Sequence, residues 1–152
     1  MDSIQLDTSA SPIWLVRYPS TFSVEMYRDY LRRFSEACVP GERYGLLLDM
    51  TRFNPIFADA ESRKAGAEEL KSNMPFYEAT MVCEARIVRN PIVRGMLTVF
   101  DWTASMQWGV RNFGNGELAE NWTRTQMANA GIAVPAERVW PTEVAPTKSP
   151  LT

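Results

Sequence analysis

The side chains that could carry out chemistry include no histidine. The chain has 152 residues, with 16 Lys and Arg, 18 Asp and Glu, and no His. The commonest general base and the commonest metal ligand are therefore missing, and neither a Ser-His-Asp nor a Cys-His centre can form within one chain. Cys38 and Cys83 are far apart and form no CxxC motif, so we expect small buried thiols rather than a zinc site. We expect no catalytic centre, no metal and no cofactor.

Asp49 and a short glycine-containing turn are the other places in the sequence where a catalytic or anion-binding site could lie. Asp49 could act as an acid or base, but no second carboxylate lies nearby in sequence, so we interpret it as a cap for a loop or helix amide. Gly114-Asn115-Gly116 precedes a predicted helix, whose amides could hold an anion. The motif is too short for a dinucleotide or phosphate loop, so we interpret it as a tight turn. An enzyme that uses Asp49 and an arginine ranks last among our hypotheses.

Two groups of side chains suit binding better than catalysis. Four arginines around the predicted third strand could meet an anionic ligand or an acidic partner, or could face solvent: Arg86, Arg89, Arg94 and Arg111. Three aromatic residues could line a ligand cavity, form an interface or fill the core: Trp102, Trp108 and Phe113.

Strands and helices that would position these groups alternate along the chain. Runs of apolar and aromatic residues predict strands over residues 13–18, 44–50, 79–84 and 106–113, with Pro75 marking a break before the third. Apolar residues at helical spacing, behind capping residues, predict helices over residues 24–38, 60–72 and 117–130, and a further helix from Pro91 through Phe100. In the last helix we expect Leu118, Trp122 and Thr125 to face inward.

The order of these elements predicts an α/β fold. The apolar run Leu46-Leu47-Leu48 is typical of a strand buried on both faces. We expect a single mixed, mostly parallel sheet of four to five strands with about four helices and right-handed crossovers. Residues 1–11 are expected to form a flexible arm, residues 12–134 a single domain, and residues 135–152 a Pro-rich tail whose first part is pinned by Trp140.

Composition excludes some partners. The formal net charge is −2, which argues against a nucleic-acid surface because phosphate binding needs a concentrated positive field. No stretch approaches the roughly 20 apolar residues of a membrane span. The first residues lack the basic and apolar regions of a signal peptide, so we expect a cytoplasmic location.

Three segments resemble the STAS-like (anti-sigma-factor-antagonist) superfamily, and more narrowly small bacterial STAS/SEC14-like proteins: Tyr44-Gly45-Leu46-Leu47-Leu48-Asp49, Asn90-Pro91-Ile92-Val93-Arg94-Gly95 and Glu117-Leu118-Ala119-Glu120-Asn121-Trp122. The similarity spans about residues 13–131 and lies mostly in topology and hydrophobic pattern. It implies a protein that is not an enzyme and docks on partner proteins. Some members carry a phosphorylated Ser or Thr near the helix after the central strand, where this chain offers Thr51 and Ser62 without an Asp-Ser-Ser-Gly signature.

These observations lead to two hypotheses. The first is a non-catalytic regulatory or scaffold module that binds a protein partner, with a homodimer as one form of that partnership. Its binding residues would be Arg52, Phe53, Ile56, Phe57, Ser62 and Arg94, although the apolar loop that holds the first four could instead fold back on the core. The alternative, which SEC14-like relatives suggest, is a carrier or sensor of an apolar small molecule or lipid, with a pocket lined by Phe100, Trp102 and Trp108.

Overall fold

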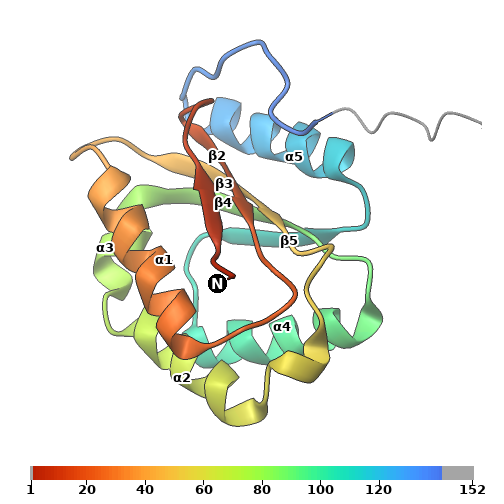
Figure 1. Ribbon diagram of the computed structural model, residues 1–152. Helices are drawn as coiled ribbons and strands as arrows, with labels where there is room; N and C mark the ends of the chain where they lie inside the picture. The colour runs from red at the N-terminus through yellow and green to blue at the C-terminus, as the bar shows by residue number, and fades with distance from the viewer. Residues whose placement is uncertain (1, 142–152) are drawn as a thin grey trace, which may run out of the picture.

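A single five-stranded sheet forms the centre of the molecule. The computed structural model describes residues 2–141. The strands lie side by side in the order β1-β2-β3-β4-β5; β2 to β5 are parallel, and β1 is antiparallel to β2 (Figure 1). Their bounds are Gln5–Asp7 (β1), Ile13–Arg17 (β2), Tyr44–Asp49 (β3), Met81–Ile87 (β4) and Gly109–Phe113 (β5). The predicted α/β fold with a mostly parallel sheet of four to five strands is confirmed.

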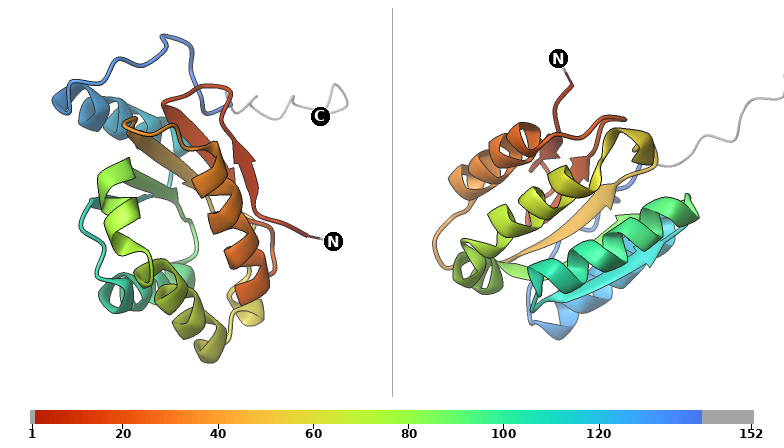
Figure 2. Two further views of the ribbon diagram at one scale, coloured as in Figure 1. Left: turned by 90° about the vertical axis from the view of Figure 1, so that its left-hand side faces the viewer. Right: turned by 90° about the horizontal axis from the view of Figure 1, so that it is seen from below.

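The helices cover the two faces of the sheet unequally. They are α1 (Val24–Ala37), the short 3₁₀ helix η1 (Pro55–Phe57), α2 (Ala60–Lys71), α3 (Met74–Thr80), α4 (Pro91–Ala104) and α5 (Gly116–Asn129). The parallel strands follow one another in a single direction across the sheet, so right-handed crossovers place every connecting helix on the same face. Helices α1 to α4 therefore share one face, and α5 packs alone on the other (Figures 1 and 2).

Capping residues fix where the main helices begin. Ser23, Asp59 and Asn90 each accept a hydrogen bond from a backbone N–H in the first turn of α1, α2 and α4, as their residue types predict. Pro75, in contrast, lies in the first turn of α3, where its missing N–H costs no hydrogen bond. The expected break at Pro75 is therefore wrong, and an additional helix precedes β4.

The central strands alternate between two apolar cores. Leu46 and Leu48 pack with α1 to α4, whereas Leu47 packs with α5, and all three are almost completely buried. The burial of this run on both faces is confirmed. At Gly45 a Cβ atom would lie 3.0 Å from both Met127 Sδ and Thr123 Cγ2. The absence of a side chain at Gly45 therefore lets α5 approach β3 closely.

The inward face of α5 differs from the expected one. Leu118 is 58% exposed and Thr125 also faces solvent, so their expected inward position is wrong. The buried residues are instead Gly116, Ala119, Glu120, Thr123 and Met127. Asn115 caps the helix by accepting from the N–H groups of Glu117 and Leu118. This cap fixes where α5 begins, and therefore which of its residues face the sheet.

The first residues of the chain are part of the sheet. Residues 5–7 pair with β2, and Ile4 is fully buried. The Arg33 guanidinium on α1 donates to the Ile4 carbonyl at 2.6 Å. A flexible arm over residues 1–11 is therefore wrong for this segment, because backbone pairing and one apolar anchor hold it in place.

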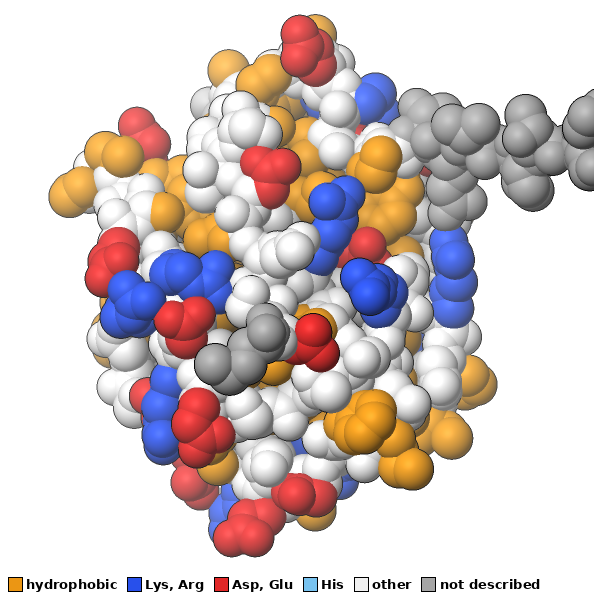
Figure 3. All heavy atoms as spheres, in the orientation of Figure 1, with side chains coloured by type: hydrophobic (Ala, Val, Ile, Leu, Met, Phe, Trp, Pro, Cys, Tyr) orange, Lys and Arg blue, Asp and Glu red, His pale blue; other side chains and the backbone are white. Residues whose placement is uncertain are grey.

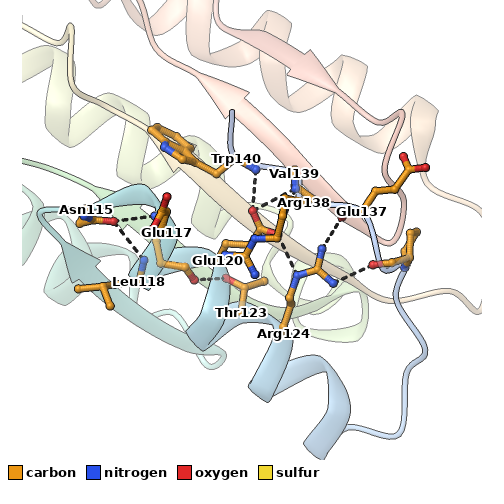
Figure 4. A network of polar contacts seen from close by, with 12 residues as sticks. Asn115, Glu117, Leu118, Glu120, Thr123, Arg124, Glu137, Arg138, Val139 and Trp140 are labelled. Atoms are coloured by element: carbon orange, nitrogen blue, oxygen red, sulfur yellow. Dashed lines mark hydrogen bonds and ion pairs between the residues drawn. The ribbon is translucent and has the colours of Figure 1, made fainter. Parts of the chain in front are cut away.

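Residues 135–140, called the strap below, cross the face that α5 leaves uncovered (Figure 4). The fully buried Glu120 carboxylate accepts from the backbone N–H groups of Val139 at 3.0 Å and Trp140 at 2.6 Å. Arg124 pairs with Glu120 at 2.8 Å and also donates to two carbonyls of the strap. Trp140 is 8% exposed and packs with Ile13, Leu15 and Leu47, so it pins the tail as expected. Residues 142–152 of the predicted tail lie outside the described residues.

The electrostatics of Glu120 agree with this anchoring. Burial alone would raise the pKa of the Glu120 carboxyl. The backbone hydrogen bonds from the strap, together with Arg124 and Arg138, outweigh that effect and hold the pKa below its ordinary value. Glu120 is therefore a carboxylate at neutral pH. It accepts the hydrogen bonds that the backbone N–H groups of the strap would otherwise donate to water.

Two glycine substitutions test the seating of the strap. A Cβ atom at Gly116 would overlap the Trp140 indole, so we expect Gly116→Ala to lower the free energy of unfolding by about 1–3 kcal/mol. Gly95 lies on the exposed side of α4 with no atom within 4 Å of its Cβ position, so Gly95→Ala should raise it by about 0.5–1 kcal/mol. Urea unfolding followed by circular dichroism measures both. Equal stability of the two variants would show that Trp140 does not lie over Gly116.

Candidate functional site

An apolar cavity of about 80 Å³ lies between the sheet and the layer formed by α1, α2 and α4. Its wall is largely aromatic and includes Tyr18, Phe22, Tyr27, Tyr30, Phe34, Phe53, Tyr77, Phe100 and Trp108. A water needs about 10–15 Å³, whereas an engineered cavity that binds benzene measures about 150 Å³. This space suits a ligand smaller than benzene, or one that extends past the half-buried lining residues Met96, Leu97 and Phe100 toward solvent.

The aromatic wall is held by edge-on ring contacts. Phe53 lies 6.3 Å from the ring centres of both Tyr18 and Phe22, and Tyr27 lies 6.2 Å from that of Phe100 in a nearly perpendicular arrangement. Such pairs favour fixed geometry beyond the area that they bury. Phe53 is 9% exposed, so the prediction that it contacts a protein partner is wrong. The first part of its loop folds back on the core instead.

Two charged side chains of the cavity wall, Glu84 and Arg86, form an ion network with Asp101. Arg86 on β4 is 2% exposed and donates from Nε to Glu84 Oε2 at 2.7 Å. Its two terminal nitrogens donate to the carboxylate oxygens of Asp101 on α4, at 2.9 and 2.7 Å. Every nitrogen of the guanidinium therefore has a carboxylate partner, which is what a buried charge requires.

The alternation of β4 explains why these charges point inward. Cys83, Ala85 and Ile87 pack toward α5, and Glu84 and Arg86 lie on the opposite face beneath α1 to α4. The expectation of a cluster of arginines that meets a ligand or solvent is wrong for Arg86. A signal was present in the sequence, since charged residues at every second position of a strand covered on both faces must find buried partners.

Burial and charge shift the pKa values of these groups. Burial raises the pKa of Glu84 above its ordinary value, and Arg86 opposes that shift. For Arg86, burial acts to lower the pKa, but the two carboxylates outweigh it and keep the guanidinium charged. Burial also raises the pKa of Tyr18, Tyr27 and Tyr30, so these phenols are neutral at physiological pH. The cavity therefore presents neutral O–H groups beside a compensated ion network.

Several polar groups of the cavity wall make no hydrogen bond within residues 2–141. The hydroxyls of Tyr18, Tyr27 and Tyr30 make no hydrogen bond within residues 2–141, although the three side chains are at most 8% exposed. The indole N–H of Trp108 lies near the Glu84 carboxylate and helps to lower its pKa, yet it makes no hydrogen bond of normal geometry. Native interiors contain few such groups. Their concentration here marks a place where a guest could supply the missing partners.

The predicted pocket residues are partly brought together. Phe100 and Trp108 line the cavity, whereas Trp102 is 76% exposed on the outer side of α4. The prediction that Trp102 lines a pocket is therefore wrong. Asp49 accepts from the N–H and hydroxyl of Thr51, at 3.0 and 2.6 Å, so it stabilises a turn as its capping interpretation predicts.

The predicted partner-binding residues are spread over two elements. Arg52, Ile56 and Phe57 are exposed before α2, with Ile56 at 79%. Ser62 is half-buried, and its backbone N–H donates to the capping carboxylate of Asp59. Arg94 is exposed but turns back toward the sheet, donating to the Val88 carbonyl from Nε and one terminal nitrogen. The exposed loop residues thus form one group, and Arg94 is not part of it.

A second exposed apolar group lies on α4. Seven large hydrophobic side chains are exposed within the described part of the chain, and the five that lie on η1 and α4 are together called the docking patch below: Ile56, Phe57, Ile92, Val99 and Trp102. Figure 3 shows hydrophobic side chains gathered at the lower right of the molecule, over η1 and the start of α4. Sequence reasoning missed Ile92 and Val99, although their spacing with Trp102 places all three on one side of a helix.

Within residues 2–141, no group of three or more Cys, Asp or Glu side chains is arranged to hold a metal ion. Nor does that part of the chain contain a helix with the length and apolar character needed to cross a bilayer. Both cysteines are free, and Cys83 is buried as expected while Cys38 is half-buried.

Tyrosine substitutions test whether the cavity hydroxyls are unpaired. Tyr44 accepts from the Val39 N–H at 2.9 Å and donates to Glu42 at 3.1 Å, so Tyr44→Phe should lower the free energy of unfolding by about 1 kcal/mol. Tyr27→Phe and Tyr30→Phe remove no such bond and should change it by less than about 0.5 kcal/mol. Urea unfolding measures all three. A loss at Tyr27 or Tyr30 as large as that at Tyr44 would reveal a bound partner, such as ordered water.

Comparison with known proteins supplies no family for this chain. It matches none of the protein-family models, curated proteins or solved structures against which it was compared. The resemblance to STAS-like proteins therefore stays a prediction.

Proposed function

We propose that this protein binds a small, largely apolar molecule in the cavity beneath α1, α2 and α4. The observation that carries the proposal is an aromatic wall with unused hydrogen-bonding groups: Tyr18, Tyr27 and Tyr30 make no hydrogen bond within residues 2–141, and the buried indole N–H of Trp108 has no partner there. A buried N–H without a hydrogen bond is costly, and the hydroxyls of the wall are free to donate to or accept from a guest. A guest with an apolar body and a polar atom would fill the space and satisfy at least one of them.

The chemistry of the cavity supports binding without turnover. Two of its charged groups, Glu84 and Arg86, are paired with each other, and Arg86 also pairs with Asp101. The third, Arg63, is a permanent cation that cannot act as a base, and no cysteine lines the wall. The tyrosines are neutral, with pKa values raised by burial, so they act as hydrogen-bond donors rather than as bases. No nucleophile lies next to a free base among the lining residues.

Methionine methyl groups offer a direct test of binding. Met50, Met81, Met96 and Met106 line the cavity, whereas Met127 is fully buried on the α5 face. Titration of ¹³C-methyl-methionine protein with cyclohexanol or 3-methyl-1-butanol should shift the four cavity resonances in NMR spectra and leave Met127 unchanged. No shift with either alcohol, or equal movement of Met127, would contradict the proposal.

A second candidate function is docking of another copy of this chain on the docking patch. Helix α4 exposes Ile92, Val99 and Trp102 at 65%, 57% and 76%, although its other side already packs against the core. Patches of this kind mark interaction sites, and a two-fold dimer would cover the same patch on both copies.

Oligomeric state tests this second candidate. We expect the wild-type chain to sediment as a dimer at about 100 µM, since an apolar interface of this kind supports micromolar association. The double variant Ile56→Ser/Trp102→Ser should sediment as a monomer. Leu118→Ser changes an exposed leucine on α5, 58% exposed and outside the patch, and should leave the dimer intact. A monomeric wild type, or an equal effect of Leu118→Ser, would contradict docking of a second copy here.

A further inference from the structure

We propose that the ligand is a small monocarboxylic acid, with its carboxylate bound by Arg63 and its apolar body in the cavity. The inference rests on the proposed binding function and deepens it by assigning a ligand class. Arg63 belongs to the first turns of α2, lines the cavity and is half-buried. It is thus a cation at the edge of an otherwise apolar space.

The guanidinium of Arg63 has donors to spare. Within the described part of the chain its one hydrogen bond runs from a terminal nitrogen to the Ala58 carbonyl, at 3.1 Å, and it forms no ion pair. A guanidinium carries five N–H donors in a planar fork that matches the two oxygens of a carboxylate. Arg86, in contrast, is already saturated by Glu84 and Asp101. Arg63 is therefore the cation of the cavity that can receive a new anion.

The nearest acidic side chain does not neutralise Arg63. Asp59 accepts from the Ser62 N–H at 2.7 Å and acts as the cap of α2. Its pKa is lowered chiefly by the bonds from Ser62, with Arg63 a smaller influence. The positive end of α2, a helix of 12 residues, also favours a negative group near Arg63. A ligand carboxylate would thus meet a cation that has only one protein bond.

Independently of Arg63, the cavity offers space and hydrogen-bonding groups for the rest of the ligand. Tyr27 and Tyr30 are 5% and 4% exposed, line the same space and leave their hydroxyls unpaired. The cavity volume of about 80 Å³ limits the body of the ligand to a few carbon atoms or to a longer group that is partly exposed. A single guanidinium matches a single negative charge. These features together favour a short, branched or cyclic monocarboxylate over a phosphate or a long-chain lipid.

Three isosteric probes test the ligand class. We expect 3-methylbutanoate to bind about tenfold more tightly than 3-methyl-1-butanol at pH 7 and low salt, because it adds a charge-assisted bond at a half-exposed site. The cation 3-methylbutylamine should bind more weakly than the alcohol. Titration followed by the cavity methionine resonances measures all three affinities.

Two charge-removing variants distinguish a direct bond from Arg63 to the ligand from the general effect of positive charge near the cavity. Arg63→Gln should abolish the preference for the anion and leave alcohol binding unchanged. Lys64→Gln removes the same charge from the neighbouring, exposed position and should keep the preference. The inference is wrong if both variants lose anion affinity equally, if Arg63→Gln keeps the preference, or if wild-type protein binds the alcohol as tightly as the acid. Failure of all three probes to bind would instead reject the proposed function itself.

Discussion

The buried network of Glu84, Arg86 and Asp101 is the constraint on which the rest of the structure depends. A guanidinium that is 2% exposed is tolerated only when carboxylates surround it, and breaking such a buried pair typically costs about 3–5 kcal/mol. Glu84 comes from the same strand, but Asp101 comes from α4 and binds in a bidentate manner. Because Arg86 belongs to β4 and its partner Asp101 belongs to α4, this ion pair fixes where α4 crosses the sheet. Apolar packing alone would not fix it, since α4 carries hydrophobic side chains on both of its sides.

The position of α4 creates both candidate binding surfaces. Its inner side contributes Val93, Leu97 and Phe100 to the cavity wall, and its outer side contributes most of the docking patch. Large aromatic rings dominate the layer between the helices and the sheet, and they meet edge-on rather than filling all of the space. Three phenol groups that line the remaining space make no hydrogen bond within the described residues. Small-molecule binding and self-association are thus two uses of a single helix, set in place by one ion network.

The sequence predicts the parts of this fold that depend on local chemistry. Caps at Ser23, Asp59 and Asn90, and the apolar run of β3, follow from neighbouring residues, and the structure confirms them. The candidate site depends on distant contacts. Arg86 meets Asp101 15 residues later, and nothing local tells Phe53, which is buried, from Trp102, which is exposed. Strand β1 has only three residues, which are too few for an alternating pattern to predict it. The side of α5 that faces the sheet follows from the close approaches at Gly45 and Gly116 rather than from the hydrophobic pattern of the helix.

The strap has a consequence for the limits of the folding unit. Helix α5 is alone on its face of the sheet, so Trp140 covers part of Ile13 and Leu15 of β2 on that face. The edge of β2 is hydrogen-bonded to β1. Both ends of the described part of the chain therefore contact β2. Fraying at either terminus uncovers this strand first, so its amide protons report on the closure of the whole domain. The smallest autonomous unit accordingly includes both Ile4 and Trp140. A polypeptide cut at the last residue of α5 loses the two strap amides that donate to the Glu120 carboxylate and keeps only its ion pair with Arg124.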